Sequence, residues 1–307
     1  MPFKHALLLS KIAVTAVIMA FTASALAQPK APSKLDTSEK EAQVFRYTHK
    51  ANASKFYKTH QTQSISTDSM GGKITTEFKL GMTTTMKTRK VLPDGVAVIE
   101  TSYDTFNIDF IQNGTKLSAE QTKPLGEMFK KIRSTSKLSA RGEPQDQQYE
   151  DVEPGMRQMT ESLKGSMVGL MPIFPEQPVK IGDSWKQKIP LDVVQGPIKI
   201  AMLFNVQYTF LGFTKVKSRR VGVFKADVGV TVNDKPGNDA IKLSLKGKGK
   251  GNGFCYFDQK AGELIQSELE LEQTVNMNIE ASGDAQSLKI GTRSMTSMSL
   301  SDSASRQ

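Results

Sequence analysis

The stretch that decides the fold is IKLSLKGKGKGNGFCYF, residues 241–257, with its return ELIQSELELEQTVNMNIEA, residues 263–281. In the first segment apolar residues and glycines alternate with lysines, and in the second leucine, valine and methionine alternate with glutamates. A period of two is typical of β-strands that bury one face. The two segments therefore predict an antiparallel hairpin closed through residues 258–262, with Leu269 and Leu271 on its buried face.

This closure predicts the cross-strand register of the hairpin. The expected pairs are Lys250–Glu270, Lys248–Glu272, Gly251–Leu269 and Gly249–Leu271. The first two pairs place opposite charges across the ladder, which helps to fix the register. The glycines remove side chains from a strip of the buried face. Such a strip lets another element approach closely, or lets the sheet curl.

A second hairpin is predicted in the N-terminal half. Apolar residues and threonines occupy every second position from Ile74 to Met86, and Pro93-Asp94-Gly95 then forms a turn. Folding the chain about this turn predicts the pairs Leu80–Ile108, Phe78–Phe110 and Met82–Phe106. A slip of one residue would expose one apolar face, so the register is well specified.

Further alternating segments, residues 198–210, 224–232 and 288–300, predict more strands of the same kind. One segment differs, because its apolar residues are spaced by three and four. They are Met156, Met159, Leu163, Met167 and Leu170. This spacing predicts one amphipathic helix over residues 156–171, ended by Pro172. Its methionines are either a pliable surface for a ligand or core packed against a sheet.

The expected fold is therefore mainly β, with two curved antiparallel sheets or half-barrels and one intervening amphipathic helix. A basic start with Lys4 and Lys11, an apolar run over residues 12–21 and Ala25-Leu26-Ala27 predict a signal peptide cleaved after Ala27. The organisation follows as signal peptide 1–27, disordered leader 28–44, N-terminal β-rich half 45–172 ending in the helix, C-terminal β-rich half 173–301 and loose tail 302–307.

Export implies a periplasmic or extracellular protein, and no apolar run after residue 27 is long enough to predict a transmembrane segment. Cleavage removes two lysines and lowers the formal net charge from +10 to +8. The basic excess suggests anionic envelope components as partners. Aromatic residues are only 7% of the chain, so the interleaved basic and aromatic residues that bind single-stranded nucleic acid are not expected.

The sequence predicts no catalytic residue, metal ligand or cofactor. After cleavage only His49 and His60 remain as histidines, and neither a nucleophile motif nor a paired metal-ligand motif accompanies them. Cys255 is the only cysteine and is predicted to be a small buried hydrophobic residue. Residues 247–253, GKGKGNG, lack the Gly-Lys-Ser/Thr ending of a phosphate-binding loop.

Three segments carry a resemblance to a known family. They are LSARGE at 138–143, PEQPVKIGDSW at 175–185, and Phe257-Asp258 followed by Gly262 and Leu264. Together they resemble a family of exported bacterial proteins of unknown function, over roughly residues 45–300. The resemblance implies an export signal followed by two curved antiparallel sheets with a helix between them. It implies no activity, cofactor or catalytic residue.

Two functional hypotheses follow. The first is a non-enzymatic envelope protein that holds an apolar or amphiphilic ligand in the hollow of a curved sheet, as periplasmic lipoprotein carriers do by fold-level analogy. The residues predicted to contact the ligand are Met82, Phe106, Met159, Leu163, Met167, Gly249, Gly251, Leu269 and Leu271. The alternative is a structural or protein-interaction β protein with a filled core and no ligand.

Overall fold

The computed structural model describes residues 29–69, 72–150, 168–195, 198–234, 242–281 and 284–302. The predicted signal peptide and tail lie outside these residues, apart from Asp302. The elements are β1 (Ser54–Ser69), β2 (Gly72–Val91), β3 (Ala97–Gln112), β4 (Thr115–Lys116), α2 (Ala119–Lys131), β5 (Arg133–Leu138), β6 (Pro144–Glu150), β7 (Ser184–Gln195), β8 (Ile198–Val216), β9 (Arg219–Asp234), β10 (Lys242–Asp258), β11 (Glu263–Ala281) and β12 (Asp284–Ser301). The fold is mainly β and antiparallel, as predicted.

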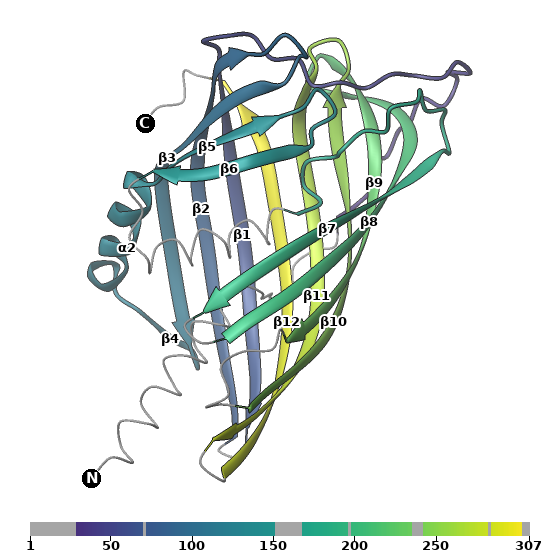
Figure 1. Cartoon of the computed structure of the whole chain (residues 1–307). Helices are drawn as coiled ribbons and strands as arrows, with labels where there is room; N and C mark the ends of the chain where they lie inside the picture. The colour runs from purple at the N-terminus through teal and green to yellow at the C-terminus, as the bar shows by residue number, and fades with distance from the viewer. Residues whose placement is uncertain are drawn as a thin grey trace.

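The described strands form one sheet rather than the two that the sequence suggests. Their order is β6-β5-β3-β2-β1-β12-β11-β10-β9-β8-β7, with β4 paired to β3. The two halves of the chain join because β1 and β12 pair from Phe56–Ser301 to Asp68–Lys289. Figure 1 shows that this open sheet is strongly curved, with β7 and β8 passing in front of β11 and β12.

We call the concave side of this sheet the inner face. Its main hydrophobic cluster combines side chains from β1 and from β8 to β12, so strands far apart in the strand order share one core. Phe204 and Val206 on β8 and Val228 on β9 are among its buried members. The core is completed by Leu170 and Phe174 from the segment before β7.

The N-terminal hairpin has the predicted register. Leu80 lies opposite Ile108, and the other two predicted pairs also form. Bulges interrupt the ladder on the turn side of these pairs, between Thr83 and Thr84 and between Thr88 and Lys90. Because a bulge changes which residues face inward, Ala97 and Ile99 are buried near the turn.

The C-terminal hairpin is shifted by two residues from the predicted register. The observed pairs include Lys250–Glu272, Lys248–Thr274, Gly253–Leu269, Gly251–Leu271 and Gly249–Gln273. The predicted turn sets Asp258 opposite Gly262, whereas Asp258 pairs with Glu263, and a bulge leaves Ile265 unpaired. The turn and the bulge each add one residue to the return strand, so together they shift the register by two. A shift of two keeps the faces, so Leu269 and Leu271 point inward as predicted and are 4% and 6% exposed.

The predicted lysine–glutamate ion pairs do not form. Glu270 and Glu272 both contact Arg293 on the neighbouring strand β12 instead. Arg293 lies directly opposite Glu272, and its guanidinium can bind two carboxylates at once.

The space beside the glycines of β10 is filled by the partner strand β11. A Cβ atom on Gly251 would lie 2.3 Å from the Glu270 carbonyl oxygen, and one on Gly249 would lie 2.5 Å from Cγ of Gln273. The glycines therefore allow close approach and curling of the sheet, one of the two roles expected for them.

The helix described by the structure is α2, which the sequence did not predict. It begins with a capping box between Ser118 and Gln121, and it packs along β3. Residues 151–167, which hold most of the predicted helix, lie outside the described residues, and residues 168–170 form a turn. In the described part of the chain, no helix has the length and apolarity needed to cross a membrane.

Residues 29–44 differ from the disordered leader that their polar composition predicts. Their backbone pairs with Phe213 through Asp36 and with Val179 through Gln43. Arg220 stacks over the Phe213 ring, 3.5 Å from its centre, and contacts Glu39 at 3.6 Å. We call residues 29–48 the strap. It runs across one end of the sheet in Figure 1.

Candidate functional site

A band of polar side chains runs along the middle of the inner face. It lies on β1 and β12, the two strands that join the halves of the sheet. We call it the polar stripe, and its members are Thr59, Gln61, Gln63, Thr67, Thr292, Ser294 and Thr296. All are at most 9% exposed. Buried polar side chains normally have hydrogen-bond partners, so the question is which groups pair with these seven.

Several buried oxygens in and beside the stripe have no partner in the described part of the chain. They are Thr59 Oγ1, Gln63 Oε1, Thr84 Oγ1, Ser267 Oγ and Gln273 Oε1. Thr84 lies on β2 and the last two on β11, so these oxygens flank the stripe on both sides. An unpaired buried polar group costs about 1–3 kcal/mol. Such a cost is commonly retained where a ligand or water satisfies the group.

Apolar walls border the stripe on either side. The first wall consists of Leu80, Met82, Phe106, Phe129 and Ile132. The Phe106 and Phe129 rings stack with centres 3.8 Å apart. The second wall lies on β11 and includes Leu269, Leu271 and Val275. A polar band between two apolar surfaces matches the chemistry of an amphiphile.

The predicted contact residues divide between these two walls. Met82 and Phe106 lie opposite each other in the first wall, whereas Leu269 and Leu271 lie in the second. Gly249 and Gly251 lie beyond the second wall, where β11 fills the space beside them. Met159, Leu163 and Met167 are outside the described residues.

The second wall is partly covered by the chain itself. Gly169 has a φ of +89°, and a Cβ there would lie 3.5 Å from both Leu269 and Val228. The buried Cys255 thiol lies 3.6 Å from the carbonyl oxygens of Gly169 and Leu170. Residues 168–174 therefore fill this side of the interior.

One end of the interior is closed by aromatic rings. Phe45 of the strap is 1% exposed, and its ring centre lies 4.9 Å from that of Phe224 and 5.6 Å from that of Phe174. Tyr47 packs against Phe257 at 4.9 Å. We call these five residues the aromatic plug. Since apolar side chains fill this end, it offers no route into the interior.

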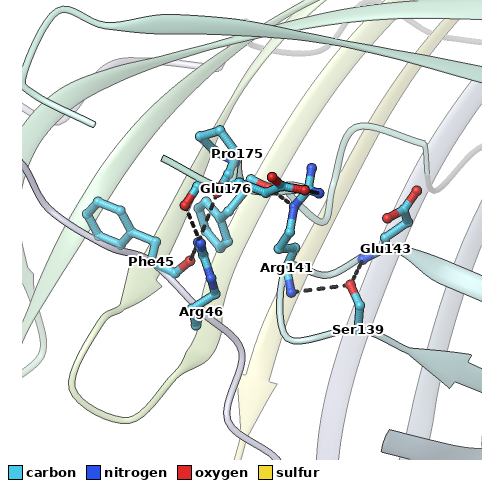
Figure 2. Close-up of polar contacts among 8 residues, drawn as sticks. Phe45, Arg46, Ser139, Arg141, Glu143, Pro175 and Glu176 are labelled. Atoms are coloured by element: carbon cyan, nitrogen blue, oxygen red, sulfur yellow. Dashed lines mark hydrogen bonds and ion pairs between the residues drawn. The ribbon is translucent and has the colours of Figure 1, made fainter. Parts of the chain in front are cut away.

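Two arginines hold the strap and the plug in place (Figure 2). Arg46 donates to the carbonyl oxygens of Pro175 at 2.9 Å and Glu176 at 2.6 Å. Arg141 donates to the Phe174 carbonyl oxygen at 2.7 Å and to the Glu176 carboxylate at 3.0 Å. The strap, the loop before β6 and the segment before β7 are thus tied together.

The outer face of the sheet carries a different kind of concavity. A groove of about 770 Å³ crosses β7 to β11. Lys186, Lys188 and Lys250 contribute ammonium groups to it. Of its carboxylates, Glu270 and Glu272 contact Arg293, and Asp227 contacts Lys225. The side chains at its outer positions are charged or amides, so this groove suits an ionic partner rather than an apolar chain.

Two titratable side chains of the interior have pKa values shifted by burial. Burial raises the pKa of Cys255 to about 12, so its thiol stays protonated and unreactive. Within the described ranges no three His, Cys, Asp or Glu side chains are placed to share a metal ion. Burial and then the nearby Lys55 ammonium lower the pKa of His49 to about 4.

Sequence reasoning missed the polar stripe. In β1 the inner positions hold Thr and Gln and the outer positions also hold polar residues, as in THQTQS at 59–64. Hydrophobic alternation therefore does not reveal which face is buried. The available signal was the pairing of β1 with β12, and that pairing joins distant parts of the chain.

Comparison with known proteins gives one family match. The model of DUF6263, a family of unknown function, matches residues 125–264. The matched region runs from within α2 to the start of β11 and includes Arg141, Glu176 and most of the plug. None of the curated proteins matches the chain. The similarity is thus to an uncharacterised family.

Proposed function

We propose that this protein is an exported, non-enzymatic protein of the cell envelope that binds an amphiphilic ligand on the inner face of its sheet. The observation that carries the proposal is the set of buried, unpaired oxygens beside the polar stripe, between two apolar walls. The ligand's apolar part would contact the first wall, which includes Met82 and Phe106. Its polar part would contact the stripe.

Binding of this kind requires no reactive group, because burial of apolar surface and a few well-placed hydrogen bonds provide the affinity. Export is supported by the N-terminal basic, apolar and small-residue pattern that ends at Ala27. The free ammonium groups of the outer groove support an anionic envelope component as a second, ionic partner.

Native mass spectrometry of protein purified from the envelope of expressing cells tests the ligand. We expect a species heavier than the polypeptide, whose extra mass is removed by extraction with organic solvent. A mass equal to that of the polypeptide alone, in gentle conditions that preserve noncovalent lipids, would contradict the proposal. The same spectrum tests export, since the polypeptide should begin at Gln28.

The second candidate is a structural or protein-interaction role with a filled core. It is favoured by the aromatic plug and by the packing of Gly169 and Leu170 against the second wall. This role predicts a protein free of lipid that crosslinks in the envelope to a protein partner. Recovery of such a crosslink from lipid-free protein favours it over the first proposal.

A further inference from the structure

We infer that the bound amphiphile has an uncharged, hydroxyl-bearing polar group, as in a monoacylglycerol or a long-chain alcohol. This inference rests on the proposed function and narrows it. It comes from the chemistry of the inner-face residues around the unpaired oxygens.

The described strands leave the middle of the inner face without a charged side chain. On β1 the inward positions from Tyr57 to Thr67 carry only hydroxyl, amide and apolar side chains, and so do those on β12 from Leu288 to Met298. The facing positions of β2 and β11 are likewise uncharged. A carboxylate or ammonium headgroup placed there would lose its hydration without gaining a counter-charge, which is strongly unfavourable.

Charged groups of the described chain also lie at the plugged end of the interior. There Lys55 contacts Glu263 at 3.3 Å, and Arg219 contacts Asp258 at 3.6 Å. These charges compensate one another beside the turn between β10 and β11. They are therefore not free to receive a headgroup at the stripe.

The unpaired atoms also set the direction of hydrogen bonding. Gln63 Oε1 and Gln273 Oε1 are amide oxygens that can only accept hydrogen bonds. Thr59 Oγ1 and Ser267 Oγ are hydroxyls that both donate and accept. A ligand hydroxyl supplies the donor that the amide oxygens lack, whereas a carboxylate or phosphate oxygen would repel them.

Three lauryl amphiphiles with one chain and different headgroups test this inference. We would titrate 1-monolauroylglycerol, laurate and dodecyltrimethylammonium, each below its micelle concentration, into the delipidated full mature protein. We expect the glyceride to bind at least about tenfold more tightly than either ion. If laurate or the ammonium binds as tightly as the glyceride, the inference is wrong but the proposed function stands. If none of the three binds, both are wrong.

Gln63→Leu tests the role of the stripe directly. It removes one amide acceptor at similar volume, and we expect affinity for the glyceride to fall about tenfold. The matched control is Gln207→Leu on the outer face of β8, which should leave affinity unchanged. Equal affinity of Gln63→Leu and the unsubstituted protein, with both folded by circular dichroism, would overturn the assignment.

Discussion

Gln63 on β1 lies directly opposite Ser294 on β12. This pair sits at the centre of the seam that joins the two ends of the chain into one sheet, and both side chains are buried on the inner face. The centre of the seam is therefore mainly polar, while the inner positions of the strands on either side of it are mainly apolar. The proposed binding of an amphiphile depends on that contrast.

If the stripe binds a ligand, its unpaired polar groups should lower the stability of the ligand-free protein. Thr59→Val replaces a buried, unpaired hydroxyl with a methyl group of the same shape. We expect it to raise the free energy of unfolding of the delipidated protein by about 1 kcal/mol, measured by urea denaturation. Thr62→Val, on the outer face of the same strand, should change it by less than about 0.5 kcal/mol. A clear loss of stability in Thr59→Val would show that the hydroxyl is paired.

The glycine strip predicts a sharp difference between two glycines of the sheet. In Gly251→Ala the new Cβ would meet the Glu270 carbonyl oxygen at 2.3 Å, so β11 must move away. We expect the unfolding free energy to fall by about 2–4 kcal/mol. Gly229→Ala is the control, because its Cβ would find its nearest neighbour at 3.9 Å. Equal effects of the two substitutions would mean that close approach of β11 does not explain the strip.

Arg46 should determine whether the strap stays in place. Arg46→Ala removes the hydrogen bonds to Pro175 and Glu176, and we expect a loss of about 1–3 kcal/mol of stability. Hydrogen exchange of strap amides, including Tyr47, should become faster while that of β9 stays slow. Lys40→Ala, an exposed strap position, is the control. Unchanged exchange in Arg46→Ala would show that the aromatic contacts alone hold the strap.

The lowered pKa of His49 predicts that the protein loses stability in mild acid. Its folded pKa of about 4 lies below the value of about 6.5 for an unfolded histidine. The unfolded chain therefore binds more protons between these values, and stability falls as pH drops from about 6.5 to about 4. His49→Gln should flatten this part of the stability–pH curve. Superimposable curves for His49→Gln and the unsubstituted protein would refute this assignment.

The parts of the fold that the sequence predicts are those with local, unambiguous signals. The turn at Asp94 and strong alternation predicted the Met82–Phe106 pair correctly. The C-terminal register failed because the turn and a bulge at Ile265 each add one residue to the return strand. The total shift of two leaves the alternation of faces beyond the bulge unchanged, so the pattern does not reveal it. Ser118 and Gln121 form a capping box, which is a local sequence signal for the start of α2.

Other features depend on contacts between distant residues. The joining of the sheet through β1 and β12 brings residues such as His60 and Ser297 together, and no local pattern encodes that. The strap has a polar composition, but a few residues such as Phe45 and Arg46 anchor it. The same contrast holds for the candidate site. Local alternation predicts the apolar walls, whereas the polar stripe depends on the pairing of β1 with β12.

Photocrosslinking on β12 tests the central claim most directly. Ser294 faces the stripe and Ser297 faces the opposite side of the same strand, so p-benzoylphenylalanine is introduced at one or the other position and irradiated in cells. We predict a covalent lipid adduct, seen in the mass of the purified protein, for the Ser294 variant and not for the Ser297 variant. Adducts at neither position, or equally at both, in variants that keep the thermal stability of the parent, would contradict a ligand on the inner face.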